Sequence, residues 1–145
     1  MSMGNVTELD IIKLIFQKTL PSNLGTLNTT GDTNLHIHLH TADPTESGIP
    51  SSFEATYTNY TVQSVIRTSG GWTCATAGDI TTAKNFAVIS FPQCGASVSN
   101  VITHVSISDE ADTKILYSGQ LNDSLNVSNL ILPQFQATNL VVTQD

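Results

Sequence analysis

The sequence predicts an all-β protein, a jelly-roll-like β-sandwich of about eight strands with one short α-helix at its N-terminus. First, apolar and polar residues alternate strictly over residues 34–40, which is the two-residue period of a half-buried strand. Second, short apolar runs recur along the rest of the chain between turn-forming residues. Third, charged residues make up only 12% of the chain, whereas an exposed helical surface is normally rich in Glu, Lys and Arg.

The composition is typical of a single soluble domain. At 145 residues, with 39% hydrophobic residues and a mean hydropathy of +0.03, the chain is long enough to bury a core of its own. Its five basic residues are scattered and the formal net charge is −7, so no basic patch is available to neutralise phosphates. No apolar run approaches the ~20 residues of a membrane span. We therefore expect no direct binding to nucleic acid and no membrane partner.

An amphipathic helix is predicted over residues 7–20, with Thr7 at the N-cap position and Pro21 ending the pattern. Its apolar stripe is wide enough either to pack over one end of the β domain or to bury itself against another subunit. The candidate interface residues on this stripe are Leu9, Ile12, Ile15, Phe16 and Leu20. The predicted domain division is residues 1–21 for the helical segment and 34–145 for the β-sandwich.

The segment 34–44, N-L-H-I-H-L-H-T-A-D-P, carries three histidines on one face of its predicted strand. The alternation separates two sets of side chains: Leu35, Ile37 and Leu39 on one face, and His36, His38 and His40 on the other. Pro44 ends the segment because proline has no N–H to donate to a strand ladder.

The histidine face has two interpretations. Residues two apart on a strand face are roughly 6.5–7 Å apart, so two adjacent imidazoles could share a zinc ion, whose nitrogen ligands bind at about 2.0–2.1 Å. Further ligands would be needed, and the obvious ones are His104 and Asp43. We favour a surface or interface face without a metal, and we expect no cofactor. A metal-binding enzyme that uses His36, His38 and His40, with His104 as a further candidate ligand, is the minor alternative.

Further strands are predicted at short intervals after a polar loop at residues 45–52. They cover residues 57–68, 72–75, 85–91, 100–108, 113–118, 124–132 and 135–143. Gly70 and Gly71 predict a tight hairpin between the first two of these strands. The two cysteines, Cys74 and Cys94, lack metal-ligand spacing, and the sequence leaves open whether they form a disulfide or remain free thiols.

No catalytic constellation is evident in the sequence. There is no G-x-S-x-G nucleophile elbow and no glycine-rich phosphate loop. Asp109, Glu110 and Asp112 crowd a single turn, which is typical of a solvated loop rather than of a general acid–base pair. Trp72 follows two glycines, and we interpret it as core or interface filler rather than as a carbohydrate platform. We therefore predict that the protein is not an enzyme.

Residues 35–48, L-H-I-H-L-H-T-A-D-P-T-E-S-G, resemble the L-x-L-x-L-H-T-A-D-P-x-x-x-G segment of a family of small tailed-phage virion structural proteins. Further landmarks of that family follow in the same order, at residues 57–68, 71–73, 89–92, 101–107, 116–121 and 133–143. The resemblance covers nearly the whole chain, including the N-terminal helix. It departs from the family pattern at His36 and His38, where the family typically has Tyr and Gly or Ala.

The resemblance implies a non-enzymatic structural protein of the bacteriophage virion, assembled in the host cytoplasm. Members of the family are described as tail-fibre-like, and small β-sandwich proteins of this size also serve as capsid decoration or cement subunits. We favour a capsid decoration subunit that binds the major capsid protein and stabilises the assembled shell by burying apolar area on it. A tail-fibre or adhesin-like appendage that binds tail proteins is the alternative. We expect a homo-oligomer.

Overall fold

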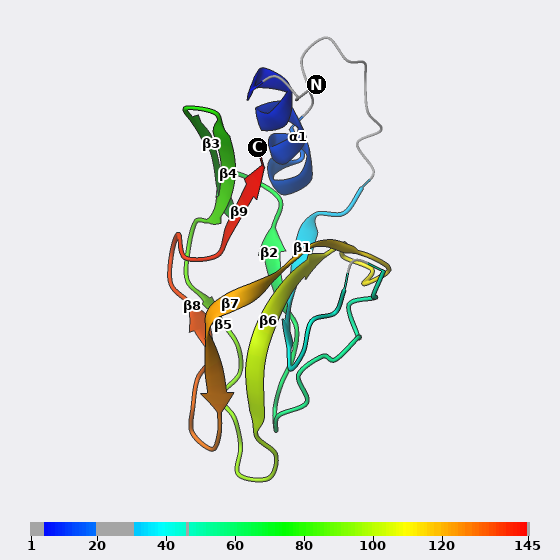
Figure 1. Ribbon diagram of the computed structural model, residues 1–145, viewed down its shortest axis with the longest axis vertical. Coiled ribbons are helices and arrows are strands. Elements are labelled where there is room, and N and C mark those ends of the chain that lie inside the picture. Colours follow the sequence, from blue (N-terminus) through cyan, green and yellow to red (C-terminus); the bar gives the residue numbers. More distant parts are fainter. Residues whose placement is uncertain (1–4, 20–30, 46, 145) are drawn as a thin grey trace. The chain divides into compact units, whose positions relative to one another are not determined.

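The structure is a computed structural model that describes residues 5–19, 31–45 and 47–144 (Figure 1). In these residues it has one helix and nine strands: α1 (Asn5–Gln17), β1 (Asn34–His40), β2 (Gln63–Ile66), β3 (Trp72–Ala77), β4 (Ile80–Asn85), β5 (Ile89–Ser90), β6 (Asn100–Ser108), β7 (Ile115–Val127), β8 (Gln134–Phe135) and β9 (Val141–Gln144). The sheets are built from antiparallel strands, so the predicted all-β class with one short N-terminal helix is confirmed. Nowhere in these ranges is a helix both long and apolar enough to span a membrane.

The chain divides into two compact units that interleave along the sequence. The first unit contains Met1–Thr33, Ile66–Ile89 and Phe135–Asp145, and the second contains Asn34–Val65 and Ser90–Gln134. This grouping differs from the predicted segments 1–21 and 34–145, because the helix packs with strands that are distant in the sequence.

The first unit packs α1 against a three-stranded sheet with the order β3-β4-β9 (Figure 1). β4 pairs antiparallel with both of its neighbours. Ile12 and Phe16 of α1 are fully buried, and the ring of Phe16 meets that of Trp72 edge-on, with the ring centroids 4.6 Å apart. Trp72 is itself fully buried, which confirms its interpretation as a core residue.

Arg67 holds the C-terminal end of α1, whose last turn contains no basic residue. Its guanidinium donates from Nε to the carbonyl of Ile15 over 2.7 Å and from Nη2 to the carbonyl of Leu14 over 2.9 Å. Nη1 donates to the carbonyl of Asp32 over 2.9 Å. The last carbonyls of a helix have no partner within the helix and form the negative end of its dipole. Arg67 therefore supplies the cation that the last turn of the helix lacks.

The helix lies earlier in the chain than the predicted segment 7–20. Thr7 is inside α1 rather than at its N-cap, and the helix ends three residues before the predicted end. Lys18 adopts a left-handed φ of 52°, which interrupts the helical hydrogen-bond pattern. Lysine carries no local signal for this conformation, so the sequence did not indicate the early end. Pro21 lies outside the described residues.

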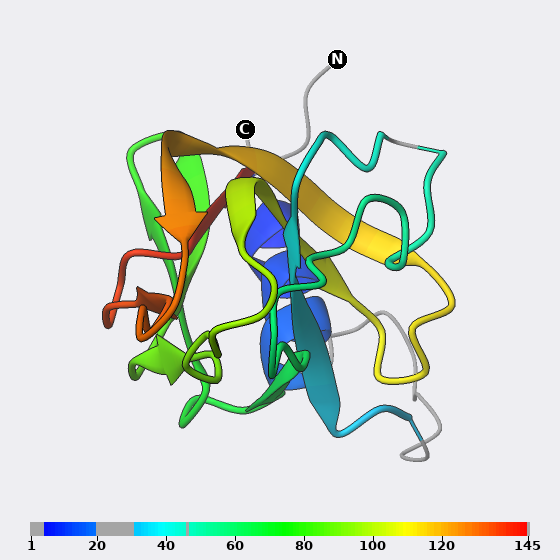
Figure 2. The same ribbon diagram turned by 90° about the horizontal axis from the view of Figure 1, so that it is seen from below.

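The second unit contains a four-stranded sheet with the order β2-β1-β6-β7, seen from two directions in Figures 1 and 2. Leu35, Ile37 and Leu39 of β1 are buried, as the alternation predicted. The opposite face is buried too, because His38 is 1% exposed and His40 is fully buried. The prediction of a surface or interface face is therefore wrong for these two histidines, because they are buried within the chain itself.

Two strands match their predictions residue for residue, β1 at 34–40 and β6 at 100–108. The predicted strand 57–68 is shorter, since only β2 is extended and Asn59, at a φ of 77°, lies in a turn before it. The hairpin predicted at Gly70 and Gly71 is wrong. β2 pairs with β1, and β3 instead turns into β4 around Gly78, which has a φ of 62°.

The later strands are divided differently from the prediction. Segments 113–118 and 124–132 contribute to one continuous strand, β7, in which Gly119 lies opposite Val105. The predicted strand 135–143 separates into β8 and β9, because the connection between them hydrogen-bonds to Asn85 instead. The Asn85 amide accepts from the N–H of Leu140 over 2.9 Å and donates to the carbonyl of Gln136 over 2.8 Å. Of the predicted strand 85–91, only its first residue and β5 are extended.

Replacing Arg67 with alanine tests the attachment at the end of α1. We expect the free energy of unfolding to fall by about 2 kcal/mol, because hydrogen bonds to charged groups contribute about 1.5–3 kcal/mol. Arg67→Lys keeps the charge but loses the planar fork of donors, so its stability should lie between those of the wild type and Arg67→Ala. Urea unfolding followed by circular dichroism measures these differences. Equal free energies for all three proteins would contradict the role assigned to Arg67.

Candidate functional site

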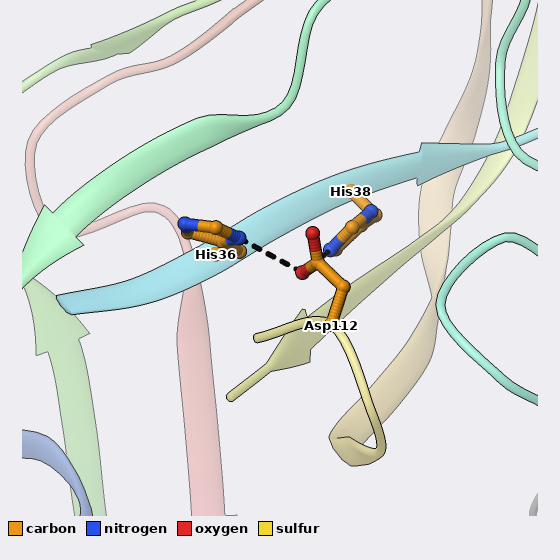
Figure 3. Close-up of side chains that lie close together, drawn as sticks. All are labelled: His36, His38 and Asp112. Carbon is orange, nitrogen blue, oxygen red and sulfur yellow. Dashed lines mark hydrogen bonds and ion pairs between the residues drawn. The ribbon is translucent and has the colours of Figure 1, made fainter. Parts of the chain in front are cut away.

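The polar face of β1 brings together titratable side chains from three segments of the second unit. β1 contributes His36 and His38, the loop between β6 and β7 contributes Asp112, and the segment before β2 contributes Glu54. Figure 3 shows the Asp112 carboxylate lying between the two imidazoles. We call His36, His38 and Asp112 the histidine cluster.

The side chains of the histidine cluster meet at one carboxylate oxygen. Asp112 Oδ1 lies 2.8 Å from His36 Nδ1 and 3.0 Å from His38 Nε2. The hydroxyl of Ser108 donates to the same oxygen over 2.8 Å. Burial alone would raise the pKa of Asp112, but hydrogen bonds from His36 and Ser108 and electrostatic attraction to the two histidines hold it below its ordinary value. Asp112 is therefore ionised at neutral pH.

The cluster is closed at one side and open at the other. The side chain of His38 is 2% exposed and that of His36 is 19% exposed, whereas the side chain of Asp112 is 40% exposed. Solvent therefore reaches the cluster from the Asp112 side.

The turn that carries Asp112 is held by hydrogen bonds of its own. The Asp109 carboxylate accepts from the backbone N–H groups of Thr113, over 2.7 Å, and Lys114, over 3.0 Å. Burial alone would raise the pKa of Asp109, but the hydrogen bond from the Thr113 hydroxyl, these two backbone bonds and the charge of Lys114 together lower it. Asp112 itself has a φ of 54°, a left-handed conformation that aspartate tolerates better than most residues. The position of its carboxylate is thus built into the turn.

The interpretation of this acidic turn as a solvated loop is incomplete, because Asp112 also binds the histidines. Sequence reasoning missed that partnership since 76 residues separate Asp112 from His36. Strand pairing provides the link. His36 lies opposite Ser108 at the end of β6, directly before the turn. The pairing of β1 with β6 could not be derived from the sequence.

His38 is held on its other side by Glu54. Its Nδ1 lies 2.7 Å from Glu54 Oε1, and the hydroxyl of Tyr60 donates to the same oxygen over 3.1 Å. The Tyr60 oxygen also accepts from the N–H of Leu39 over 3.1 Å. Burial raises the pKa of Tyr60 above its ordinary value, so the phenol keeps its proton and stays a donor. Both ring nitrogens of His38 therefore have defined partners.

The structure places His40 and His104 outside the cluster. His40 Nδ1 donates to the carbonyl of Ser52 over 2.8 Å, and Nε2 accepts from the hydroxyl of Ser106 over 2.7 Å. Burial is the largest cause that lowers the pKa of His40, which fits this neutral tautomer. His104 lies opposite His40 on β6 and contacts the hydroxyl of Thr103 through Nδ1 over 2.9 Å. In the described ranges, the group able to hold an ion is therefore the histidine cluster.

The predicted interface residues of the helix have different environments. Ile12 and Phe16 are buried in the core of the first unit, so they do not form an exposed face. Leu9 and Ile15 are half-buried. Leu20 lies outside the described residues. The interface itself stays a prediction, with Leu9 and Ile15 as its partly exposed members.

Both cysteines are free thiols. Cys94 is buried, and Cys74 is half-buried on β3. Burial raises the pKa of Cys74 to about 11, which keeps it protonated and unreactive at neutral pH. These thiols therefore add no nucleophile to the candidate site.

Comparison with known proteins identifies the class to which the chain belongs, the structural proteins of the phage virion. The matching family model is described as Podophage GP4 fiber I protein gp80 and covers residues 4–143, so the chain belongs to this family of phage fibre proteins. No curated protein matches the chain. The prediction of a virion structural protein is confirmed, and the family description names a fibre.

The pH dependence of stability tests the burial of His40. Because its pKa is lowered from 6.5 in the folded chain, the unfolded chain takes up this proton first as the pH falls. The free energy of unfolding should therefore decrease below pH 6.5 until the folded-state pKa is reached. This single group contributes a slope of at most about 1.4 kcal/mol per pH unit.

The variant His40→Gln removes this titration, so its stability should depend less steeply on pH just below 6.5. Urea unfolding of the wild type and the variant at several pH values measures the two slopes. Identical slopes would show that His40 does not titrate as its buried position requires.

Proposed function

We propose that this chain is a non-enzymatic fibre subunit of a phage virion, which acts by binding neighbouring virion proteins. The observation that carries the proposal is the family match over residues 4–143. The fibre location replaces the capsid decoration role that the sequence favoured, because the family description names a fibre. Decoration of the capsid remains the alternative. The predicted homo-oligomer and assembly in the host cytoplasm stay predictions.

A run of exposed apolar residues in the second unit supports a binding role. Leu130, Ile131 and Leu132 are 69%, 39% and 49% exposed. We call these three residues the apolar loop. Consecutive exposed apolar residues are unfavourable on a surface that contacts only water, and they typically mark a contact surface. The apolar loop is therefore our proposed contact with a neighbouring virion protein.

The apolar loop is held in one conformation by the preceding part of the same unit. The N–H of Leu130 donates to the carbonyl of Cys94, and the N–H of Cys94 donates to the carbonyl of Ile131, each over 2.9 Å. The Gln93 amide donates to the carbonyl of Leu130 over 2.8 Å. Leu130 also has a left-handed φ of 69°, which is unfavourable for leucine and persists only where the surroundings impose it. A surface ordered in advance loses little conformational entropy on binding.

Cryo-electron microscopy of the intact phage tests the location. Copies of the chain on the fibres would support the proposal. Copies distributed over the shell would instead support capsid decoration and overturn the fibre assignment. A particle that lacks the chain would overturn both assignments.

Leu130→Asp tests the apolar loop as a contact. We expect the purified chain to keep its stability, because the side chain is 69% exposed. Incorporation into particles should fall at least tenfold, since a desolvated carboxylate at a contact costs more than about 1.4 kcal/mol. Complementation of a phage deleted for the gene, followed by quantitative immunoblotting of purified particles, measures incorporation.

Ile80→Asp is the matched control, because Ile80 is 51% exposed and lies in the first unit. It should leave incorporation unchanged. Equal incorporation of wild type and Leu130→Asp would remove the apolar loop from the proposal.

A further inference from the structure

We propose that the histidine cluster binds one Zn²⁺ ion through His36 Nδ1, His38 Nε2 and the carboxylate of Asp112. One ligand atom from each residue lies within 4.8 Å of those of the other two. Tetrahedral zinc with nitrogen and oxygen ligands at about 2.0–2.1 Å places those ligand atoms about 3.3 Å apart. Small side-chain rotations therefore bring all three atoms to bonding distance.

The types of ligand fit zinc. Two imidazole nitrogens and one carboxylate oxygen are donors that borderline-soft Zn²⁺ accepts, whereas Ca²⁺ and Mg²⁺ prefer oxygen alone. Three protein ligands leave one position of a tetrahedron for water. The exposed side of Asp112 provides the access for that water.

The contacts behind the ligands are those that a metal site requires. His38 Nδ1 contacts Glu54 Oε1 over 2.7 Å, which leaves Nε2 directed at Asp112. Metal-binding histidines commonly hold a carboxylate on their second nitrogen in this way, and the contact fixes the tautomer that exposes the other nitrogen. Tyr60 in turn holds Glu54, and Ser108 holds Asp112. Because His38 is almost fully buried, its direction is set before any ion arrives.

Hydrogen bonds alone could also account for the cluster, with protons on His36 Nδ1 and His38 Nε2 donated to Asp112 Oδ1. Zinc would take the place of these protons, because imidazole binds a metal only through an unprotonated nitrogen. The two explanations therefore differ in a measurable way. A zinc site takes up one ion per chain and binds it less tightly as the pH falls, whereas a cluster that serves only as a hydrogen-bonded network takes up no zinc. The zinc proposal is independent of where the chain lies in the virion.

A bound ion would connect β1 directly to the turn after β6 within the second unit. At present the turn after β6 contacts β1 through Asp112, which hydrogen-bonds to His36 and His38. Because zinc would bind the folded chain and the unfolded chain would not present this arrangement, zinc should raise the melting temperature.

Titration of the full chain with Zn²⁺ after removal of metals by a chelator tests the proposal. Isothermal titration calorimetry should give one zinc ion per chain, with weaker binding at lower pH. Thermal unfolding should shift upward by several degrees in excess zinc. Co²⁺ in place of Zn²⁺ should give the visible absorption of a tetrahedral site.

Asp112→Asn is the sharpest variant. Asparagine has the same shape, accepts hydrogen bonds and tolerates the left-handed φ of 54°, so the fold should persist while zinc affinity falls at least tenfold. His36→Asn changes a partly exposed ligand and serves as the second variant if Asp112→Asn does not fold. His104→Asn is the control, because His104 lies outside the cluster, and it should bind zinc like the wild type.

Two results would overturn the proposal. One is a wild-type chain that binds no zinc and shows no thermal shift. The other is binding that is equal in the wild type, Asp112→Asn and His36→Asn, which would place the ion elsewhere.

Discussion

The burial of the polar face of β1 is the constraint on which the second unit depends. An imidazole removed from water must find hydrogen-bond partners within the protein, because an unsatisfied buried polar group costs several kcal/mol. His40 obtains its partners from Ser52 and Ser106, and His38 obtains them from Glu54 and the end of β6. These partners lie between 12 and 70 residues from the histidines that they bind. Satisfying the histidines therefore also positions the segment before β2 and the turn after β6.

In the first unit, too, polar side chains provide the hydrogen-bond partners that other groups need. Arg67 binds the carbonyls at the end of α1, and the fully buried Asn85 binds the connection between β8 and β9. Each side chain satisfies backbone groups that no helix or strand pairs. In both units, a polar side chain from one segment gives an irregular segment its conformation.

The two features of the second unit on which the proposals rest are chemically independent. The apolar loop is an exposed, preordered surface without a titratable side chain. The histidine cluster consists of titratable side chains, and its carboxylate is partly exposed. A contact at the apolar loop would fit the family membership, since the subunits of a virion bind their neighbours. The cluster involves His36 and His38, the two histidines that stand outside the family pattern recognised in the sequence.

The sequence by itself determined the all-β class, the presence of the helix, and strands β1 and β6. Those strands carry a strict or nearly strict two-residue alternation, which is a local signal. The sequence did not indicate the β3–β4 hairpin, because its Thr- and Ala-rich strands show little apolar alternation.

Only the tertiary structure decided that the histidine face is buried and that Asp112 joins it. That contact spans 76 residues and depends on the antiparallel register that places His36 opposite Ser108. Strand order and register arise from packing of the whole unit, so no local pattern in one sequence encodes them.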